Sequence, residues 1–260
     1  MKAALNHVQG LVDKSAEPVV IFFQEMSPSD LKQISEAQWV REGFYVTDLD
    51  DRSWTRAKFG PPYGTTILID KALAVEGSPY RVLVPSRFAR DALFVDLRID
   101  SNSDEVLRLC NVHLESLVAN PPVRPLQVAR AAVHMKALNV GAALLAGDLN
   151  AIEPFDRILH TDNGLKDAFL ELGGKEDSEE GFTWGQQAPK ALRDHFGCSR
   201  MDKAFYCGNM KVVSINRIGE GIEVEAAAKE GIRKAGGETF ASDHLGLSVV
   251  FELSRLQGKI

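Results

Sequence analysis

The sequence predicts one α+β domain in which two β-sheets pack together and helices cover their outer faces. Many short apolar runs have the length of strands, and several alternate apolar and polar residues with period two, as in a sheet with one buried face. Helical stretches separate pairs of these runs, which is typical of packed layers. No linker, internal repeat or break in composition divides the 260 residues, so a two-domain split has no support.

The expected elements are distributed along the whole chain. Apolar runs rich in β-branched and aromatic residues predict strands at residues 18–23, 64–70, 80–84, 91–99, 106–113, 142–146, 200–207, 211–218 and 247–253. Helical spacing predicts helices at residues 1–12, 29–39, 122–139, 154–160 and 166–172, with Ser29 as the N-cap of the second one. Residues 173–180 are expected to form a loop, and residues 220–237 a long connection with a short helix at 225–234.

Composition argues against several classes of protein. The 45% hydrophobic and 25% charged residues are ordinary for a globular chain. The net charge of −6 argues against a protein that coats nucleic acid, but it is compatible with a site built from carboxylates and a divalent cation. No apolar run approaches the ~18 residues needed to span a membrane, and we expect no signal peptide. Three cysteines without disulfide or zinc spacing favour an intracellular location.

Polar residues gather where predicted strands end, which is where a rigid scaffold can hold functional side chains. Glu25 follows the strand at 18–23, and a carboxylate at the end of a buried strand needs a partner such as a divalent cation. His113 ends the strand at 106–113 and shares a face with Glu115, so its ring can bind a phosphate oxygen. Taken alone, Glu25 also fits a solvated strand end, and His113 also fits a core histidine bound to backbone.

Two further clusters carry acid, base and amide groups. Asp148 and Asn150 follow an apolar run and project to one side, where a carboxylate beside a carboxamide can orient a water and accept its proton. Asp243 precedes His244, and a carboxylate bonded to imidazole favours the cationic ring, which stabilises charge on a phosphoryl group. Each cluster by itself also fits a polar turn. A serine triad is a poor alternative because no Gly-x-Ser-x-Gly elbow occurs.

Weaker signals come from a strand start and a loop. Arg200 and Asp202 begin the predicted strand at 200–207. Trp184 lies in a polar loop flanked by glycine, where its ring offers a surface on which a base or another ring can stack. Packing of Trp184 on the core explains this residue equally well.

The four clusters, in this order, resemble the endonuclease/exonuclease/phosphatase superfamily. The motifs are QEM at 24–26, HLES at 113–116, GDLN at 147–150 and SDH at 242–244. Finer details resemble its 5′-tyrosyl-DNA phosphodiesterase branch (tyrosyl-DNA phosphodiesterase 2-like). They are HLES itself, RPLQ at 124–127, FTW at 182–184, RMD at 200–202, SDHLGL at 242–247, and Ser86 with Arg90 ahead of a strand. The likeness spans residues 1–253, nearly the whole chain.

The resemblance implies a four-layered α/β sandwich of the DNase I type, with two packed mixed sheets flanked by helices and residues 1–260 in one domain. It also implies that the family's first strand is missing here, because that strand carries an Asn of the metal and phosphate site and nothing equivalent precedes Glu25. A missing inner strand would leave backbone groups unpaired and apolar surface bare. We therefore expect reduced activity or solubility for this N-terminally truncated form.

The resemblance also implies metal-assisted hydrolysis of a phosphodiester. Glu25 would ligate Mg²⁺ or Mn²⁺, and Asp148 would orient and deprotonate the attacking water. Asn150 would position that water or the phosphate. His244 would stabilise the pentacovalent phosphate, with Asp243 holding its ring. The residues expected to contact the phosphate, the leaving group or the DNA are His113, Ser116, Trp184, Arg200 and Asp202.

The implied activity is that of a hydrolase for DNA repair, which removes tyrosyl or peptide adducts from DNA 5′ ends and favours the nucleus. One alternative keeps the machinery and changes the substrate, giving a general nuclease or a phosphatase of inositol phosphates or lipids. The lack of a membrane-binding signal weakens the lipid version. Another alternative is a degenerate member that only binds nucleic acid or protein. The retained carboxylates and imidazoles argue against a pure binding role, because binding alone does not require an acid, a base and a metal ligand in one set.

Overall fold

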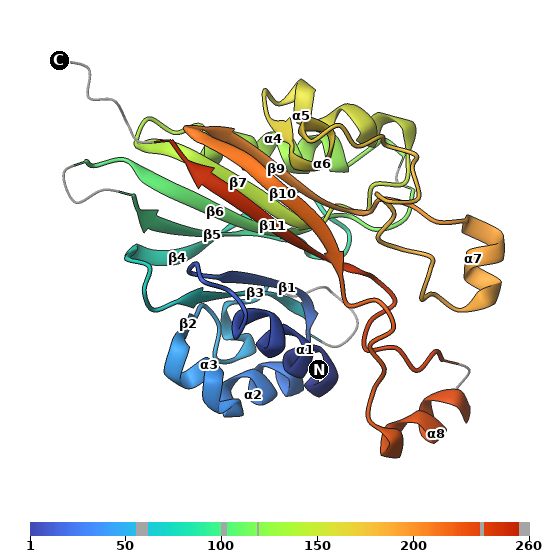
Figure 1. Cartoon of the computed structure of the whole chain (residues 1–260). Coiled ribbons are helices and arrows are strands. Elements are labelled where there is room, and N and C mark those ends of the chain that lie inside the picture. Colours follow the sequence, from blue (N-terminus) through green and yellow to red (C-terminus); the bar gives the residue numbers. More distant parts are fainter. Residues whose placement is uncertain (56–61, 100–102, 119, 235–236, 255–260) are drawn as a thin grey trace.

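The computed structural model describes residues 1–55, 62–99, 103–118, 120–234 and 237–254. Two β-layers pack face to face, and helices cover both outer faces (Figure 1). This arrangement confirms the expected four-layered α+β sandwich. Among the described residues, no helix combines the length and the apolar character needed to cross a membrane.

The first layer is a six-stranded mixed sheet. Its strands lie in the order β4 (Val75–Leu83), β5 (Asp91–Arg98), β6 (Val106–His113), β7 (Val140–Asp148), β9 (Asp202–Gly208) and β8 (Lys166–Asp167). β6 and β7 are parallel, and the other neighbours are antiparallel. Most side chains of β5 and β6 are buried, as expected for apolar strands covered on both faces.

The second layer consists of two smaller sheets. One has the order β1 (Val20–Met26), β3 (Gly64–Asp70) and β2 (Phe44–Val46), and the other pairs β10 (Met210–Ile218) with β11 (Gly246–Leu253). All these pairings are antiparallel. Apolar clusters join each small sheet to the large one: Ile67 and Ile69 of β3 pack on Leu93 of β5, while Val212 of β10 packs with Tyr206 of β9.

Helices close the two outer faces. α4 (Arg124–Met135) covers the six-stranded sheet with Val128, Ala131, Ala132 and Met135, which are spaced as one helical face. α1 (Lys2–Val12), α2 (Pro28–Glu36) and α3 (Gln38–Gly43) cover β1, β3 and β2. The connections carry η1 (Asp51–Ser53), η2 (Pro154–Ile158), α5 (Leu159–Asp162), α6 (Ala168–Glu171), α7 (Lys190–Phe196) and α8 (Ala226–Lys234).

The longer predicted elements are confirmed, and the differences have local causes. α2 begins after Ser27 rather than at Ser29, because the Ser27 hydroxyl accepts from the Asp30 N–H while the Asp30 carboxylate accepts from the Ser27 N–H. The helix expected at 166–172 divides into β8 and α6, since Asp167 pairs in the sheet and caps α6. The sequence does not predict β2, α3 or α7, because each is too short to show a period.

Candidate active site

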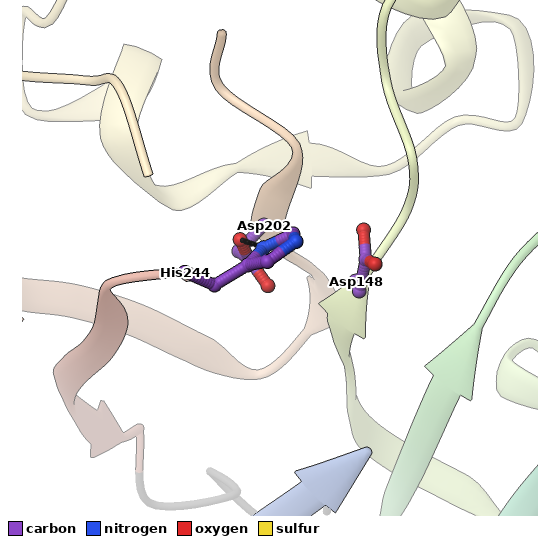
Figure 2. Close-up of side chains that lie close together, drawn as sticks. All are labelled: Asp148, Asp202 and His244. Atoms are coloured by element: carbon purple, nitrogen blue, oxygen red, sulfur yellow. Dashed lines mark hydrogen bonds and ion pairs between the residues drawn. The ribbon is translucent and has the colours of Figure 1, made fainter. Parts of the chain in front are cut away.

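Strand ends from both halves of the chain meet at one edge of the large sheet. β6 and β7 run parallel and end at His113 and Asp148, which are register partners. Asp202 begins β9 directly opposite Asp148. His244 precedes β11, and Figure 2 shows its ring beside the carboxylates of Asp202 and Asp148. Residues from three of the predicted clusters are therefore neighbours in space.

Glu25 reaches this group from the second layer. The pairing of β1 with β3 is irregular between Phe23 and Met26, and Glu25 within this bulge has a φ of 55°. A bulge re-aims a side chain away from the ladder. Glu25 Oε1 lies 3.7 Å from His113 Nε2, which itself lies 3.4 Å from Asp148 Oδ2. The Glu25 side chain is 69% exposed, so its carboxylate faces the open side of the site.

His244 and Asp202 form a hydrogen-bonded pair. His244 Nδ1 lies 2.8 Å from Asp202 Oδ2. Burial lowers the pKa of His244, but the hydrogen bond and charge of Asp202, together with the charges of Asp148 and Asp243, outweigh it and raise the pKa to about 10. The ring is therefore a cation at neutral pH, with Nδ1–H donating to Asp202 and Nε2–H free to donate to a ligand.

Asp148 is a buried carboxylate of raised pKa. Burial and the charge of Asp202 raise its pKa to about 7, against the opposing effects of His244 and the Asn150 backbone. Asn150 holds this carboxylate, because its N–H donates to Oδ1 at 2.7 Å and its Nδ2 donates to Oδ2 at 3.2 Å. An Asp with these properties can exchange a proton near neutral pH.

His113 is neutral, and its proton position follows from its neighbour. Burial, then the positive charges of Arg90 and His244, hold the pKa of His113 well below its ordinary value. Arg90 Nη1 lies 2.9 Å from Nδ1, and a guanidinium can only donate, so Nδ1 accepts and the proton resides on Nε2. Nε2–H consequently points toward the side of Asp148 and Glu25.

Arg90 is the functional group to which the sequence analysis assigns no role. It is 7% exposed, its Nη2 donates to Ser116 Oγ at 3.3 Å, and the ring of Tyr63 lies 5.0 Å from its Cζ. Its Nε has no hydrogen-bond partner among the described residues. The position directly before the apolar strand at 91–99 is a strand end like the others, and this signal could have identified it. Ser116 lies near the predicted phosphate position, because Arg90 contacts both Ser116 and His113.

The partner of the His244 ring differs from the sequence prediction. Asp243 was expected to hold the ring, but its Oδ2 accepts from Trp184 Nε1 at 3.1 Å, and Asp202 holds the ring instead. His244 is extended where it bridges to Trp184, and neighbouring side chains of an extended chain point to opposite sides, so adjacency in sequence does not bring Asp243 to the ring. Trp184 is 9% exposed and packs near Phe196, and its backbone bridges to that of His244. It therefore supports the His244 segment.

Arg200 is buried and paired with protein carboxylates, which argues against the expectation that it binds substrate. Its guanidinium is 4% exposed, makes two hydrogen bonds to Asp167 and pairs with Glu176. Phe169 covers its face, with the ring centroid 5.3 Å from Cζ. A buried cation with two carboxylate partners is a structural ion pair.

Glu115 also has a structural role. It is 1% exposed and its carboxylate accepts a hydrogen bond from Ser86 Oγ, so it holds the loop that carries Ser86.

Backbone strain is concentrated around these residues. The non-glycine residues with positive φ in the described chain are Glu25 (55°), Ala89 (58°), Leu117 (65°) and Asn150 (47°). Ala89 precedes Arg90, and Leu117 follows Ser116. Gly147 has a φ of 138°, and a Cβ there would lie 2.0 Å from the carbonyl oxygen of Val112. Such conformations persist where the surrounding structure enforces them, and they occur often at functional sites.

The donor atoms suit a hard divalent cation at Glu25. Asp148, Asp202 and His244 place one ligand atom each within 4.8 Å of one another. However, a protonated ring that donates to Asp202 offers no lone pair to a metal ion. Glu25 remains as an exposed carboxylate, with His113 Nε2 3.7 Å from its Oε1. Oxygen donors of this kind are the ligands that Mg²⁺ and Mn²⁺ prefer.

Comparison with known families identifies the group to which this arrangement belongs. The Endonuclease/Exonuclease/phosphatase family matches residues 2–244. The chain belongs to this family. Members of the endonuclease/exonuclease/phosphatase family are hydrolases that act as nucleases, phosphodiesterases or phosphatases and generally depend on divalent metal ions. The protein accordingly belongs to a family of hydrolases, and the resemblance of its motifs to this family is confirmed.

Solved structures of the family share the fold. A truncated TDP2 from Caenorhabditis elegans is 21% identical, with a TM-score of 0.69 over 97% of this chain and 89% of that one. TDP2 from D. rerio, complexed with a single-strand DNA product, is 18% identical, with a TM-score of 0.66 over 97% and 93%. The human Nocturnin catalytic domain with bound sulfate is 14% identical, with a TM-score of 0.65 over 97% and 86%. A search of curated protein sequences found no match.

Proposed function

We propose that the protein is a Mg²⁺- or Mn²⁺-dependent phosphodiesterase that hydrolyses the bond between a tyrosyl group and a DNA 5′ phosphate. The observation that supports this most is the meeting of a cationic His244, a carboxylate of raised pKa at Asp148 and the exposed Glu25 at one sheet edge. Water attacks phosphorus and gives its proton to Asp148. The bond from phosphorus to the tyrosine oxygen breaks, that oxygen takes up a proton, and a DNA 5′-phosphate remains.

The residues divide this reaction between them. Asp148 has a pKa of about 7, so much of it is ionised at neutral pH and can accept the proton of water, while Asn150 fixes its orientation. His244 presents positive charge to the phosphoryl oxygens. His113 donates Nε2–H to one of these oxygens, and Arg90 adds buried positive charge behind it. Glu25 would hold the divalent cation, which would supply Lewis-acid stabilisation of the transferring group.

Two observations support the choice of substrate. The likeness to TDP2 structures, one of them with a DNA product, is consistent with a DNA end. The ring of Tyr63 lies 5.0 Å from Arg90 Cζ and 6.1 Å from the His113 ring, so an aromatic leaving group can pack beside these groups. A tyrosyl-DNA substrate would place the protein in DNA repair and in the nucleus.

The test is release of tyrosine from an oligonucleotide with a 5′-phosphotyrosyl end. We expect release with Mg²⁺ and none with EDTA, and we expect Asp148→Asn and His244→Ala to abolish it. Asp177→Asn is the matched control, because Asp177 is an exposed aspartate paired only with exposed Arg157 among the described residues. Absence of release with Mg²⁺ from the soluble, folded protein would reject the tyrosyl substrate. Loss of turnover with DNA binding retained in both variants would exclude a pure binding module.

A different phosphodiester is the second candidate, and one observation favours it. Two residues expected on the substrate side, Arg200 and Trp184, are buried and engaged with protein groups. The site therefore offers fewer candidate contacts to a tyrosyl leaving group than to the phosphoryl group that is hydrolysed. Rates on abasic DNA, inositol phosphates and tyrosyl DNA distinguish the two. Faster hydrolysis of abasic DNA or of inositol phosphates than of tyrosyl DNA would identify the protein as a general nuclease or as an inositol phosphatase.

A further inference from the structure

Asn111 of β6 holds the start of the bulge that carries Glu25. Its side chain is fully buried and reaches across to the second layer. Asn111 Nδ2 donates to Phe23 O of β1 and to Thr66 O of β3, each at 3.0 Å. Phe23 and Thr66 are the last regular register pair before the ladder of β1 and β3 becomes irregular. One amide of the large sheet therefore binds both strands at the point where the bulge begins.

Gln24, the residue before Glu25, completes this set of hydrogen bonds. Gln24 Nε2 donates to Asn111 Oδ1 at 2.7 Å, so the oxygen and both N–H groups of the Asn111 amide have partners. The orientation of this amide is fixed, because a rotated amide would place its oxygen against two carbonyl oxygens. Gly147 lies beside Gln24, and a Cβ there would be 3.1 Å from Nε2. We call the side chains of Asn111 and Gln24 the amide clamp.

The bulge needs such support because its backbone is strained. Residues 24 and 25 of β1 together lie opposite Thr65 of β3, so β1 has one extra residue there. Glu25 has a φ of 55°, a conformation that costs free energy for a residue with a Cβ and persists where the surrounding structure enforces it. In a regular ladder the backbone of Glu25 would be extended, and its carboxylate would point in another direction.

We propose that Asn111 is a positioning residue, which together with Gln24 fixes the carboxylate of Glu25 beside His113. Asn111 and His113 are two residues apart on β6, so their side chains project from the same face of the strand. The strand that holds the bulge thus also carries the ring whose Nε2 lies 3.7 Å from Glu25 Oε1. The inference rests on the proposed function in one respect, namely that Glu25 binds the divalent cation.

Loss of the amide clamp should change metal affinity more than acid–base chemistry. The hydrogen bonds of Asn111 go to Gln24, β1 and β3, whereas the carboxylate of Asp148 is held by Asn150. Groups that hold a metal-binding side chain typically contribute about 10–100-fold to metal affinity. We therefore expect weaker metal binding without the clamp, and an unchanged pH dependence of turnover.

The first measurement is Mn²⁺ binding to Asn111→Leu, which keeps the size of the side chain and removes its three hydrogen bonds. Titration with Mn²⁺, followed by electron paramagnetic resonance, gives the affinity in the absence of substrate. We expect Mn²⁺ affinity to fall about 10–100-fold in this variant. Gln24→Met removes only one of the bonds from a half-buried residue, and we expect a loss of about 3-fold. This milder variant also serves if Asn111→Leu does not fold.

The second measurement does not depend on a metal ion. The ¹³Cα and ¹³Cβ chemical shifts of Glu25 depend on its backbone conformation, and in both clamp variants we expect them to move toward values of extended backbone. Asn163→Ala is the control, because it removes a 2.7 Å bond from Nδ2 to the carbonyl of Leu159 in α5. α5 packs on the face of the large sheet turned away from β1. The control should leave both Mn²⁺ affinity and the Glu25 shifts unchanged.

The outcomes separate the positioning role from the metal role of Glu25. Unchanged Mn²⁺ affinity and unchanged Glu25 shifts in both clamp variants would overturn the proposal. An equal loss of affinity in Asn163→Ala would also overturn it, because the effect would then follow from general destabilisation. Altered Glu25 shifts in the clamp variants, together with Mn²⁺ binding that Glu25→Gln does not weaken, would support the positioning role and reject Glu25 as the metal ligand of the proposed function.

Discussion

Asp202→Asn tests the electrostatic basis of the site. The substitution keeps the size of the side chain and an acceptor for His244 Nδ1–H, but it removes the negative charge at 2.8 Å. Asp202 is the largest cause that raises the pKa of His244 to about 10. We therefore expect the pKa in the variant to fall near the ordinary value of about 6.5, because burial then opposes only the more distant carboxylates.

The same change has a calculable effect on stability. The difference between a pKa of about 10 and the ordinary 6.5 corresponds to about 5 kcal/mol of preference for the charged ring in the folded state. If the pKa in the variant is about 6.5, we expect the variant to lose about 4–5 kcal/mol at pH 6. A raised folded pKa stabilises the protein fully below the unfolded pKa, and this contribution disappears as the pH rises toward 10. The two proteins should therefore converge in stability near pH 10.

Two measurements check this reasoning. An NMR titration follows the ring protons of His244, assigned with His244→Gln, and urea unfolding at pH 6 and pH 10 gives the free energies. Turnover of the variant should decline as the pH rises through about 7, because the ring loses its positive charge there. A pKa of His244 that stays near 10 in Asp202→Asn, or that is already near 6.5 in the unchanged protein, would refute the assignment of Asp202 as its partner.

Three other variants give simpler expectations. Asp148→Asn should lower kcat by about 10²–10⁴-fold without unfolding the protein, measured against Asp177→Asn, and full activity would remove Asp148 as the base. Asp156→Ala leaves the guanidinium of Arg124, which is 2% exposed, without its bidentate partner, so urea unfolding should show a loss of about 3–5 kcal/mol. Gly147→Ala should cost about 2 kcal/mol or more because its Cβ would meet a backbone carbonyl, and a neutral effect would contradict the close approach.

The sequence predicts which residues meet at the site better than it predicts the hydrogen bonds between them. Glu25, His113 and Asp148 each directly follow or end an apolar strand, and strands that end at one sheet edge bring such residues together. This rule depends only on local pattern and on the packing of two layers. It does not say which carboxylate meets which ring, and for His244 the nearer residue in sequence, Asp243, is the wrong one.

Long-range partners explain the remaining differences. Arg200 is buried because Asp167, 33 residues away, and Glu176, 24 residues away, converge on it, and nothing in its local sequence announces either partner. The tautomer of His113 depends on Arg90, which precedes a different strand.

The positive φ values beside the site restrict which amino acids can stand there for reasons unrelated to chemistry. Ala89 precedes Arg90 and Leu117 follows Ser116, and the side chains of Arg90 and Ser116 hydrogen-bond to each other beside His113. Left-handed backbone geometry tolerates glycine and asparagine and penalises valine, isoleucine and threonine. Natural variants at these two positions should therefore be limited to a few residue types, and a β-branched replacement would displace a neighbouring functional group while leaving every polar side chain of the site intact.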